Sequence, residues 1–229
     1  MKAARAHTAV LLFTRTSTEE ARAKKFTPST RRNKAIIRQL INRTKLLVQQ
    51  AGLPLIVIDS TKQKGETFGE RLQHAIQQVV NAGYEQVICL GNDSPGLTPG
   101  LLRLAAAKLQ HQDFVFGEAA DGGVYLIGLR QPTQFKLNFT TIPWQTAQVF
   151  QELCRQTTLF RVTILEPILA DADNTAAILA ISNTCTTSRF LIILRSLLQL
   201  CKATAVSFTP LLVAARISTP GLRAPPRGM

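Results

Sequence analysis

The sequence lacks several features that would assign it to a common class of protein. No apolar run reaches the ~18 residues that a membrane-spanning helix needs, and the first residues contain no cleavage site typical of a signal peptide. The four cysteines have no CxxC spacing, so neither a disulfide framework nor a zinc site is predicted. The sequence has no GxSxG motif and no plausible Cys–His pair for nucleophilic catalysis. These absences favour a soluble cytoplasmic protein with reduced thiols.

Acidic residues are missing from the last quarter of the chain and scarce in the first. Residues 1–50 contain 12 lysines and arginines but two acids, and residues 174–229 contain six basic residues and no acid. Residues 51–173 have nine basic and 12 acidic residues, so the net charge of +13 comes from the two ends. The basic N-terminal segment either binds a polyanion such as nucleic acid or forms the solvated face of a helix. The absence of interleaved aromatic residues favours the solvated face.

Length and apolar content predict one folded domain with a tail. The chain has 229 residues, 45% of them hydrophobic, which is enough to bury a substantial core. We expect a folded domain over residues 1–183. Residues 184–229 are expected to form a basic helix near 190–200 and then a disordered tail, because proline and glycine recur there without periodicity.

The spacing of apolar residues predicts an α/β fold with a mixed, mostly parallel sheet in a three-layer sandwich. The predicted strands are 8–14, 55–59, 86–90, 114–117, 124–129 and 162–165. The predicted helices are about 33–50, 67 onward, 98 onward, 145–156 and 175–181. The first three strands alternate with helices, which implies Rossmann-like right-handed crossovers. The fourth and fifth are joined by a connection too short for a helix, so we expect them to pair antiparallel.

The segment from Gly91 to Pro99 follows a strand and precedes a helix, which is where open α/β sheets bind ligands. Leu97 stands where a GxxxxGK[ST] phosphate-binding loop has its lysine, and this excludes that loop. Asp93 remains as a carboxylate just past a strand end. It either caps a turn or binds a hard divalent cation that bridges diphosphate oxygens.

Three further segments contain candidate site residues. Asp121 precedes two glycines, a pattern typical of a turn but also of a backbone that approaches a ligand while the carboxylate faces it. Asp171 and Asp173 lie two residues apart and either cap a helix or bind one metal ion. Trp144, the only tryptophan, is either a core residue or a wall on which a base or sugar ring stacks.

Five segments of the chain, taken in order, resemble those of a known family. They are TFGERL, GNDSPGLTP, GEAADGGVYLIGL, PWQT and DADN. Together they resemble a bacterial family of uncharacterised transferases with the glycosyltransferase-A fold. Relatives of that family include nucleotide-diphospho-sugar transferases and small nucleotidyltransferases. The resemblance runs from about Val10 to about Ile181 and is most specific between Gly91 and Leu129.

The resemblance implies a transferase that uses a nucleotide or nucleotide sugar together with magnesium or manganese. Asp93 corresponds to the family's carboxylate at the end of the third strand, which contacts the metal and the nucleotide. Asp173, with Asp171, corresponds to a late acidic position that completes the metal site. Asp121 is the catalytic candidate, because it corresponds to the loop that faces the acceptor.

The same resemblance assigns roles to two loops. Arg15, Lys24 and Lys25 lie where the first loop of the fold meets phosphate. Gly122 and Gly123 correspond to the glycines of the acceptor-side loop.

The first loop departs from the pattern of the related nucleotidyltransferases. Those proteins usually have a glycine-rich loop of the LxGGxGxRxG type directly after the first strand, whereas this chain has no glycine between Phe13 and Lys25. A loop without glycine cannot cradle a triphosphate through close backbone amides. Glycosyl transfer from a nucleotide sugar is therefore favoured over nucleotidyl transfer with release of pyrophosphate. A catalytically inert module that binds nucleic acid or an acidic partner ranks third.

Overall fold

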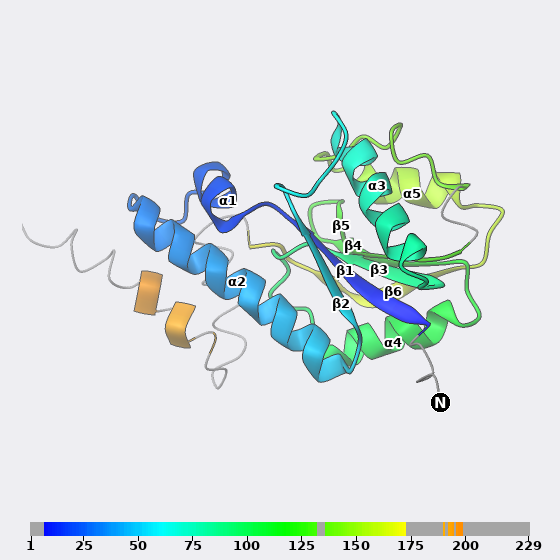
Figure 1. The fold of residues 1–229 in the computed structure, drawn as a ribbon, viewed down its shortest axis with the longest axis horizontal. Coiled ribbons are helices and arrows are strands. Elements are labelled where there is room, and N and C mark those ends of the chain that lie inside the picture. The colour runs from blue at the N-terminus through cyan, green and yellow to red at the C-terminus, as the bar shows by residue number, and fades with distance from the viewer. Residues whose placement is uncertain (1–6, 132–135, 173–189, 191, 195, 199–229) are drawn as a thin grey trace, which may run out of the picture.

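Six strands pair into one mixed sheet in the computed structural model, which describes residues 7–131, 136–172, 190, 192–194 and 196–198 (Figure 1). The strands are β1 (Thr8–Thr14), β2 (Leu55–Asp59), β3 (Gln86–Leu90), β4 (Phe114–Ala119), β5 (Val124–Arg130) and β6 (Val162–Leu169). Their order across the sheet is β2-β1-β3-β5-β4-β6. β5 is antiparallel to both of its neighbours, and the other neighbouring pairs are parallel. The predicted antiparallel pairing of the fourth and fifth strands is confirmed.

Helices cover both faces of this sheet. They are α1 (Ser17–Ala23), α2 (Thr30–Ala51), α3 (Phe68–Asn81), α4 (Pro99–Leu109) and α5 (Val149–Gln156). α3 and α5 bury their apolar side chains in one core cluster, whereas α2 and α4 pack in a second cluster on the opposite face (Figure 1). Successive strand residues point to opposite faces, so Leu11 joins the first cluster and Val10 the second. The predicted three-layer sandwich is confirmed.

The helix starts predicted from capping signals are confirmed. Thr67 caps α3, its hydroxyl accepting a hydrogen bond from the Glu70 amide, and Glu70 bonds back to the cap in a complete capping box. Thr98 caps α4, and Pro99 occupies the first helical position.

Three local predictions differ from the structure. The segment after β1, which was predicted to be a loop, contains α1. Thr16 and Glu19 form a capping box at the start of this helix, as Thr67 and Glu70 do at the start of α3. α2 begins at Thr30 because Ser29 caps it, earlier than the apolar periodicity indicates. α5 begins at Val149, since the left-handed backbone of Gln145 (φ 66°) is incompatible with a helix at the predicted start.

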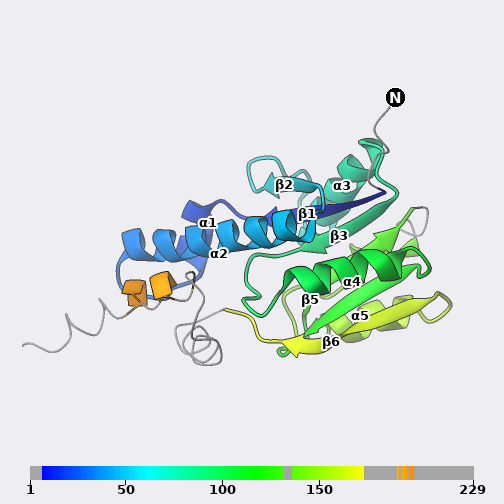
Figure 2. The ribbon, with the colours of Figure 1, turned by 90° about the horizontal axis from the view of Figure 1, so that it is seen from below.

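The N-terminal half of α2 extends past the sheet beside α1 (Figure 2). A third apolar cluster joins these two helices, with Phe26, Ile36 and Ile37 among its buried members. Leu194 and Leu198 are also buried in this cluster, so part of the predicted C-terminal helix contacts α2. The predicted helix at 175–181 lies outside the described residues. Among the helices that the structure describes, none is long and apolar enough to cross a membrane.

Candidate functional site

A cleft of about 530 Å³ opens at the carboxyl ends of β1 and β3. The chain leaves β1 toward β2, at one edge of the sheet, and leaves β3 toward β4, on the other side. The two strands therefore flank the switch point at which open α/β sheets bind ligands. Thr14 at the end of β1 donates a hydrogen bond to Asn92 Oδ1 (3.1 Å) after β3, and both side chains line the cleft.

Most of the predicted site residues line this single cleft, although they come from separate segments of the chain. The residues concerned are Arg15, Lys24, Asp93, Asp121, Gly123, Trp144 and Asp171. Asp173 lies outside the described residues. Lys25 does not line the cleft: with Arg22 and Asn33 it borders a separate hollow between α1 and α2.

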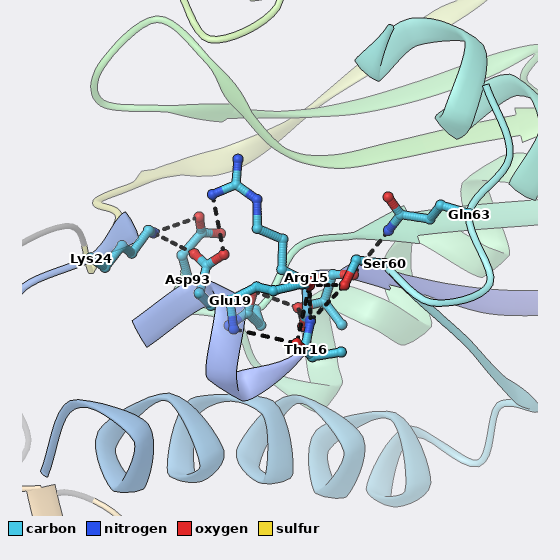
Figure 3. A network of polar contacts seen from close by, with 10 residues as sticks. Arg15, Thr16, Glu19, Lys24, Ser60, Gln63 and Asp93 are labelled. Carbon is cyan, nitrogen blue, oxygen red and sulfur yellow. Dashed lines mark hydrogen bonds and ion pairs between the residues drawn. The ribbon is translucent and has the colours of Figure 1, made fainter. Parts of the chain in front are cut away.

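One end of the cleft, which we call the charged end, is a network of ionic side chains at α1 (Figure 3). Lys24 Nζ lies 3.0 Å from Asp93 Oδ2 and 3.8 Å from Glu20 Oε1. Arg15 Nη1 lies 3.6 Å from Glu20 Oε2. Glu20 is 7% exposed, and two cations balance the cost of burying its carboxylate. The network thus holds Arg15 and Lys24 at the cleft before any ligand binds.

α1 is tied to the loop that follows β2. The Thr16 amide donates to Ser60 Oγ (3.0 Å), and the Ser60 hydroxyl donates to the Glu19 carboxylate (Figure 3). The same carboxylate accepts hydrogen bonds from the Thr16 hydroxyl (3.0 Å) and the Thr16 amide (3.3 Å). Together with the bond from Ser60, they hold the pKa of Glu19 below its usual value of 4.5. Gln63 from the same loop donates to the Thr14 carbonyl (2.9 Å). These contacts fix the position of the helix that supplies Glu20 and Lys24.

The segment after β6 reaches the loop after β3. The Ala172 amide donates to the Asp93 carbonyl (2.6 Å), and Ser94 Oγ donates to Asp171 Oδ1 (2.8 Å). Two of the three predicted metal ligands, Asp93 and Asp171, therefore line the same cleft. Within the described part of the chain, no three His, Cys, Asp or Glu side chains form a metal-binding group. Two carboxylates do fit magnesium, which takes one or two protein carboxylates and completes its shell with water and substrate phosphates.

The turn between β4 and β5 combines a local hydrogen bond with a close packing contact. Asp121 Oδ1 accepts a hydrogen bond from the Gly123 amide (2.9 Å), which fixes the orientation of the carboxylate. Gly122 has φ 86°, and a Cβ there would lie 2.2 Å from the Ala147 carbonyl oxygen. The Phe150 amide donates to the Gly122 carbonyl (3.0 Å). Gly122 therefore joins this turn to the start of α5 and is not among the residues that line the cleft.

A second part of the cleft, which we call the aromatic end, is formed by Phe13, Phe68 and Trp144. The Phe68 ring centroid lies 5.5 Å from that of Phe13 and 4.9 Å from that of Trp144. Trp144 Nε1 donates to the Phe139 carbonyl (2.7 Å), so the indole is held at both its ring face and its polar atom. A Cβ at Gly69 would lie 2.1 Å from this carbonyl oxygen, so only glycine allows α3 to approach it.

Cys89 lies in the floor of the cleft at the end of β3. The side chain is buried, and burial raises the pKa of its thiol far above the usual value. A thiol in this state is protonated and a weak nucleophile.

Sequence reasoning missed several residues that build the site. Glu20 was available from its four-residue spacing to Lys24, which places both side chains on one helix face once α1 is recognised. Asn92 and Gly69 lie inside the motifs that carry the resemblance. Their contacts, with Thr14 and with Phe139, join segments that are distant in the sequence, and no local pattern indicates them.

The chain matches one protein family over part of its length. Residues 42–146 match the family described as "Uncharacterized protein conserved in bacteria (DUF2064)". This match confirms the resemblance to an uncharacterised bacterial family. It covers α3, the loop after β3, the β4–β5 turn and Trp144, which together form much of the cleft.

The chain is similar to several solved structures. A candidate nucleotide-diphospho-sugar transferase from Desulfovibrio desulfuricans G20 is 23% identical, with a TM-score of 0.71 over 85% of this chain and 98% of that one. This similarity confirms the predicted fold class. A cytidylyltransferase from Leptospira borgpetersenii (12% identity, TM-score 0.49) covers 88% of this chain and 96% of its own. Rv0371c from Mycobacterium tuberculosis H37Rv, solved in complex with manganese, is 11% identical with a TM-score of 0.48. The match covers 79% of this chain and 100% of that one. Comparison with curated protein sequences gives no match.

Proposed function

Starting from the family match and the transferase-like fold, we propose that this protein transfers a group from a nucleotide-activated donor, with a nucleotide sugar as the preferred donor class. One observation carries the proposal. Side chains from three separate segments line a single cleft at the switch point between β1 and β3, namely Arg15 and Lys24 at α1, Asp93 after β3 and Asp171 after β6. Cations suited to phosphate and carboxylates suited to a metal ion thus occur together where such folds bind nucleotides.

Arg15 and Lys24 would bind the phosphates of the donor. The segment between Phe13 and Lys25 contains no glycine and forms α1, so side-chain cations replace the backbone amides of a glycine-rich loop. Arginine binds phosphate oxygens in a bidentate fashion, and lysine supplies a compact positive charge. A diphosphate fits two such cations.

Asp93 and Asp171 would hold a magnesium or manganese ion, with Asp173 as the third predicted ligand. When bound, such a cation stabilises the negative charge that develops on a departing diphosphate. Asp93 also follows Asn92, whose hydrogen bond with Thr14 joins the carboxyl ends of β1 and β3. The protein's own contribution is to fix the carboxylates and the cations around the phosphates.

Asp121 would orient or deprotonate the acceptor. Its carboxylate lines the cleft and keeps a fixed orientation through the Gly123 amide, as a general base requires. Trp144 lines the same cleft and offers a ring face for an acceptor sugar or a base.

A nucleotidyltransferase that attacks the α-phosphate of a nucleoside triphosphate is the second candidate on this fold. The absence of a glycine-rich loop disfavours it, because a triphosphate needs more donors than two side chains supply. The released product separates the two reactions: a nucleoside diphosphate indicates glycosyl transfer, and pyrophosphate indicates nucleotidyl transfer.

The first test is the change in melting temperature with a panel of nucleoside triphosphates, nucleoside diphosphates and nucleotide sugars, each with and without manganese. We expect a manganese-dependent increase with one nucleotide class, which Asp93→Asn abolishes. If no nucleotide raises the melting temperature and the protein binds nucleic acid in a salt-sensitive way, the proposal of an enzyme is overturned and the inert basic module is favoured.

A further inference from the structure

Lys24 lies between two carboxylates, and this position suggests a role in addition to phosphate binding. Its ammonium lies 3.0 Å from Asp93 Oδ2 and 3.8 Å from Glu20 Oε1, and its side chain is only 17% exposed. It therefore occupies one of the two oxygens that Asp93 would offer to a divalent cation. A positive charge at this distance repels a second cation strongly, since solvent screens it little.

We infer that Lys24 is a built-in cation that competes with the metal ion for Asp93, so that the metal binds well only after the donor's phosphate has drawn the lysine away. This inference rests on the proposed function, because it takes Asp93 as a metal ligand and Lys24 as a phosphate ligand. It adds that the two ligands depend on each other: the metal binds tightly together with the donor and weakly without it.

Glu20 makes the exchange feasible. It lies on α1, four residues before Lys24, which directly follows that helix, and its buried carboxylate contacts Lys24 and Arg15 together. When Lys24 leaves Asp93, it keeps a partner, so its ammonium is never left unpaired in the cleft. Glu20 is thus a positioning residue that holds the lysine within reach of both the phosphate and Asp93.

The exchange makes the two ligands cooperative. An anion that binds Lys24 frees Asp93 for the metal, and a metal on Asp93 frees Lys24 for the anion, so each raises the affinity of the other by the same factor.

The test is a titration of the full chain with manganese chloride and no nucleotide, following the loss of the free Mn²⁺ signal by electron paramagnetic resonance. We expect Lys24→Met to bind Mn²⁺ at least about tenfold more tightly than the wild type, since it removes an ammonium in contact with the ligand oxygen. The double variant Lys24→Met/Asp93→Asn should lose this gain. Lys24→Gln, which keeps a polar group, serves if Lys24→Met does not fold.

Arg15→Met is the matched control, because it removes a positive charge from the same cleft but not from the contact with Asp93. Its gain should be clearly smaller than that of Lys24→Met, and equal gains would overturn the inference. No gain in Lys24→Met and Lys24→Gln, although the wild type binds nucleotides, would overturn the inference and leave the proposed function intact. If Lys24→Met binds Mn²⁺ more tightly but the protein binds no nucleotide, the competition for Asp93 is supported and the proposal of a nucleotide-activated donor is overturned.

Discussion

The two ends of the cleft are held in place by different kinds of interaction. At the charged end Arg15, Lys24 and their acidic partners are paired at 3.0–3.8 Å, so every charge has a partner that a ligand can replace. At the aromatic end Trp144 is fixed by ring packing and by a hydrogen bond to a backbone carbonyl. The charged end can therefore exchange partners with a ligand, whereas the aromatic end keeps its shape.

The largest expected effect is on the stability of the aromatic end. Gly69→Ala places a Cβ 2.1 Å from the Phe139 carbonyl oxygen, so the helix or the carbonyl must move. We expect a loss of about 2–3 kcal/mol in the free energy of unfolding, measured with urea. Gly100 is the matched control, because it holds the second position of α4, as Gly69 does in α3, and a Cβ there would lie at an ordinary contact distance of 3.6 Å from Thr98 Oγ1. Gly100→Ala should be neutral or stabilising by up to about 1 kcal/mol, and equal losses would contradict the account.

The second prediction concerns ligand binding at the charged end. Arg15→Met should weaken binding of the donor nucleotide about tenfold, or about 1.4 kcal/mol, because it removes one of two phosphate-binding cations. Calorimetric titration measures this change. Arg38→Met removes the same charge from an exposed position of α2 and should leave the affinity unchanged. If Arg38→Met weakens nucleotide binding as much as Arg15→Met does, the affinity comes from the net positive charge of the protein and not from contacts in the cleft.

The third prediction separates the two ends. Trp144→Phe keeps a ring but removes the donor to the Phe139 carbonyl, so the unfolding free energy should fall by about 1 kcal/mol. Nucleotide affinity should be retained, because the charged end is untouched. A loss of nucleotide affinity larger than that of Arg15→Met would show that the indole, rather than the cations, dominates donor binding.

The smallest expected effect is on pH dependence at α1. The pKa of Glu19 is held below 4.5 by hydrogen bonds from Ser60 and Thr16, so its stabilising contribution is present above that pH and is lost as the pH falls. Glu19→Gln should therefore show a shallower decline in unfolding free energy between about pH 5 and pH 3 than the wild type. A decline in Glu19→Gln as steep as that of the wild type would contradict this role of Glu19.

The fold could be predicted from the sequence because its signals are local. Buried strands such as Leu55–Asp59 are short apolar runs, and the capping residues Thr67 and Thr98 mark helix starts directly. α1 escaped prediction because it has only seven residues and no apolar stripe of its own. The start of α5 was placed too early because the backbone of Gln145 is set by its surroundings and not by its type.

The candidate site could be predicted only in part, since motifs give residues but not their partners. Asp93 and Asp171 were identified from their place after strands, but the bond from Ala172 to Asp93 joins segments far apart in the sequence. Lys24 and Lys25 were indistinguishable in sequence, and α1 directs Lys24 to the cleft and Lys25 to another hollow. Gly122 was assigned to a ligand loop, whereas its contacts are with Ala147 and Phe150.

The most direct test of the account is to map where the donor binds by amide hydrogen exchange. The protein would be compared with and without the nucleotide or nucleotide sugar that raises its melting temperature most, in the presence of manganese. The account predicts slower exchange in the segments 14–25 and 91–98, which form the charged end. Protection confined to the basic face of α2, with no change at these two segments, would contradict a nucleotide site at the switch point between β1 and β3.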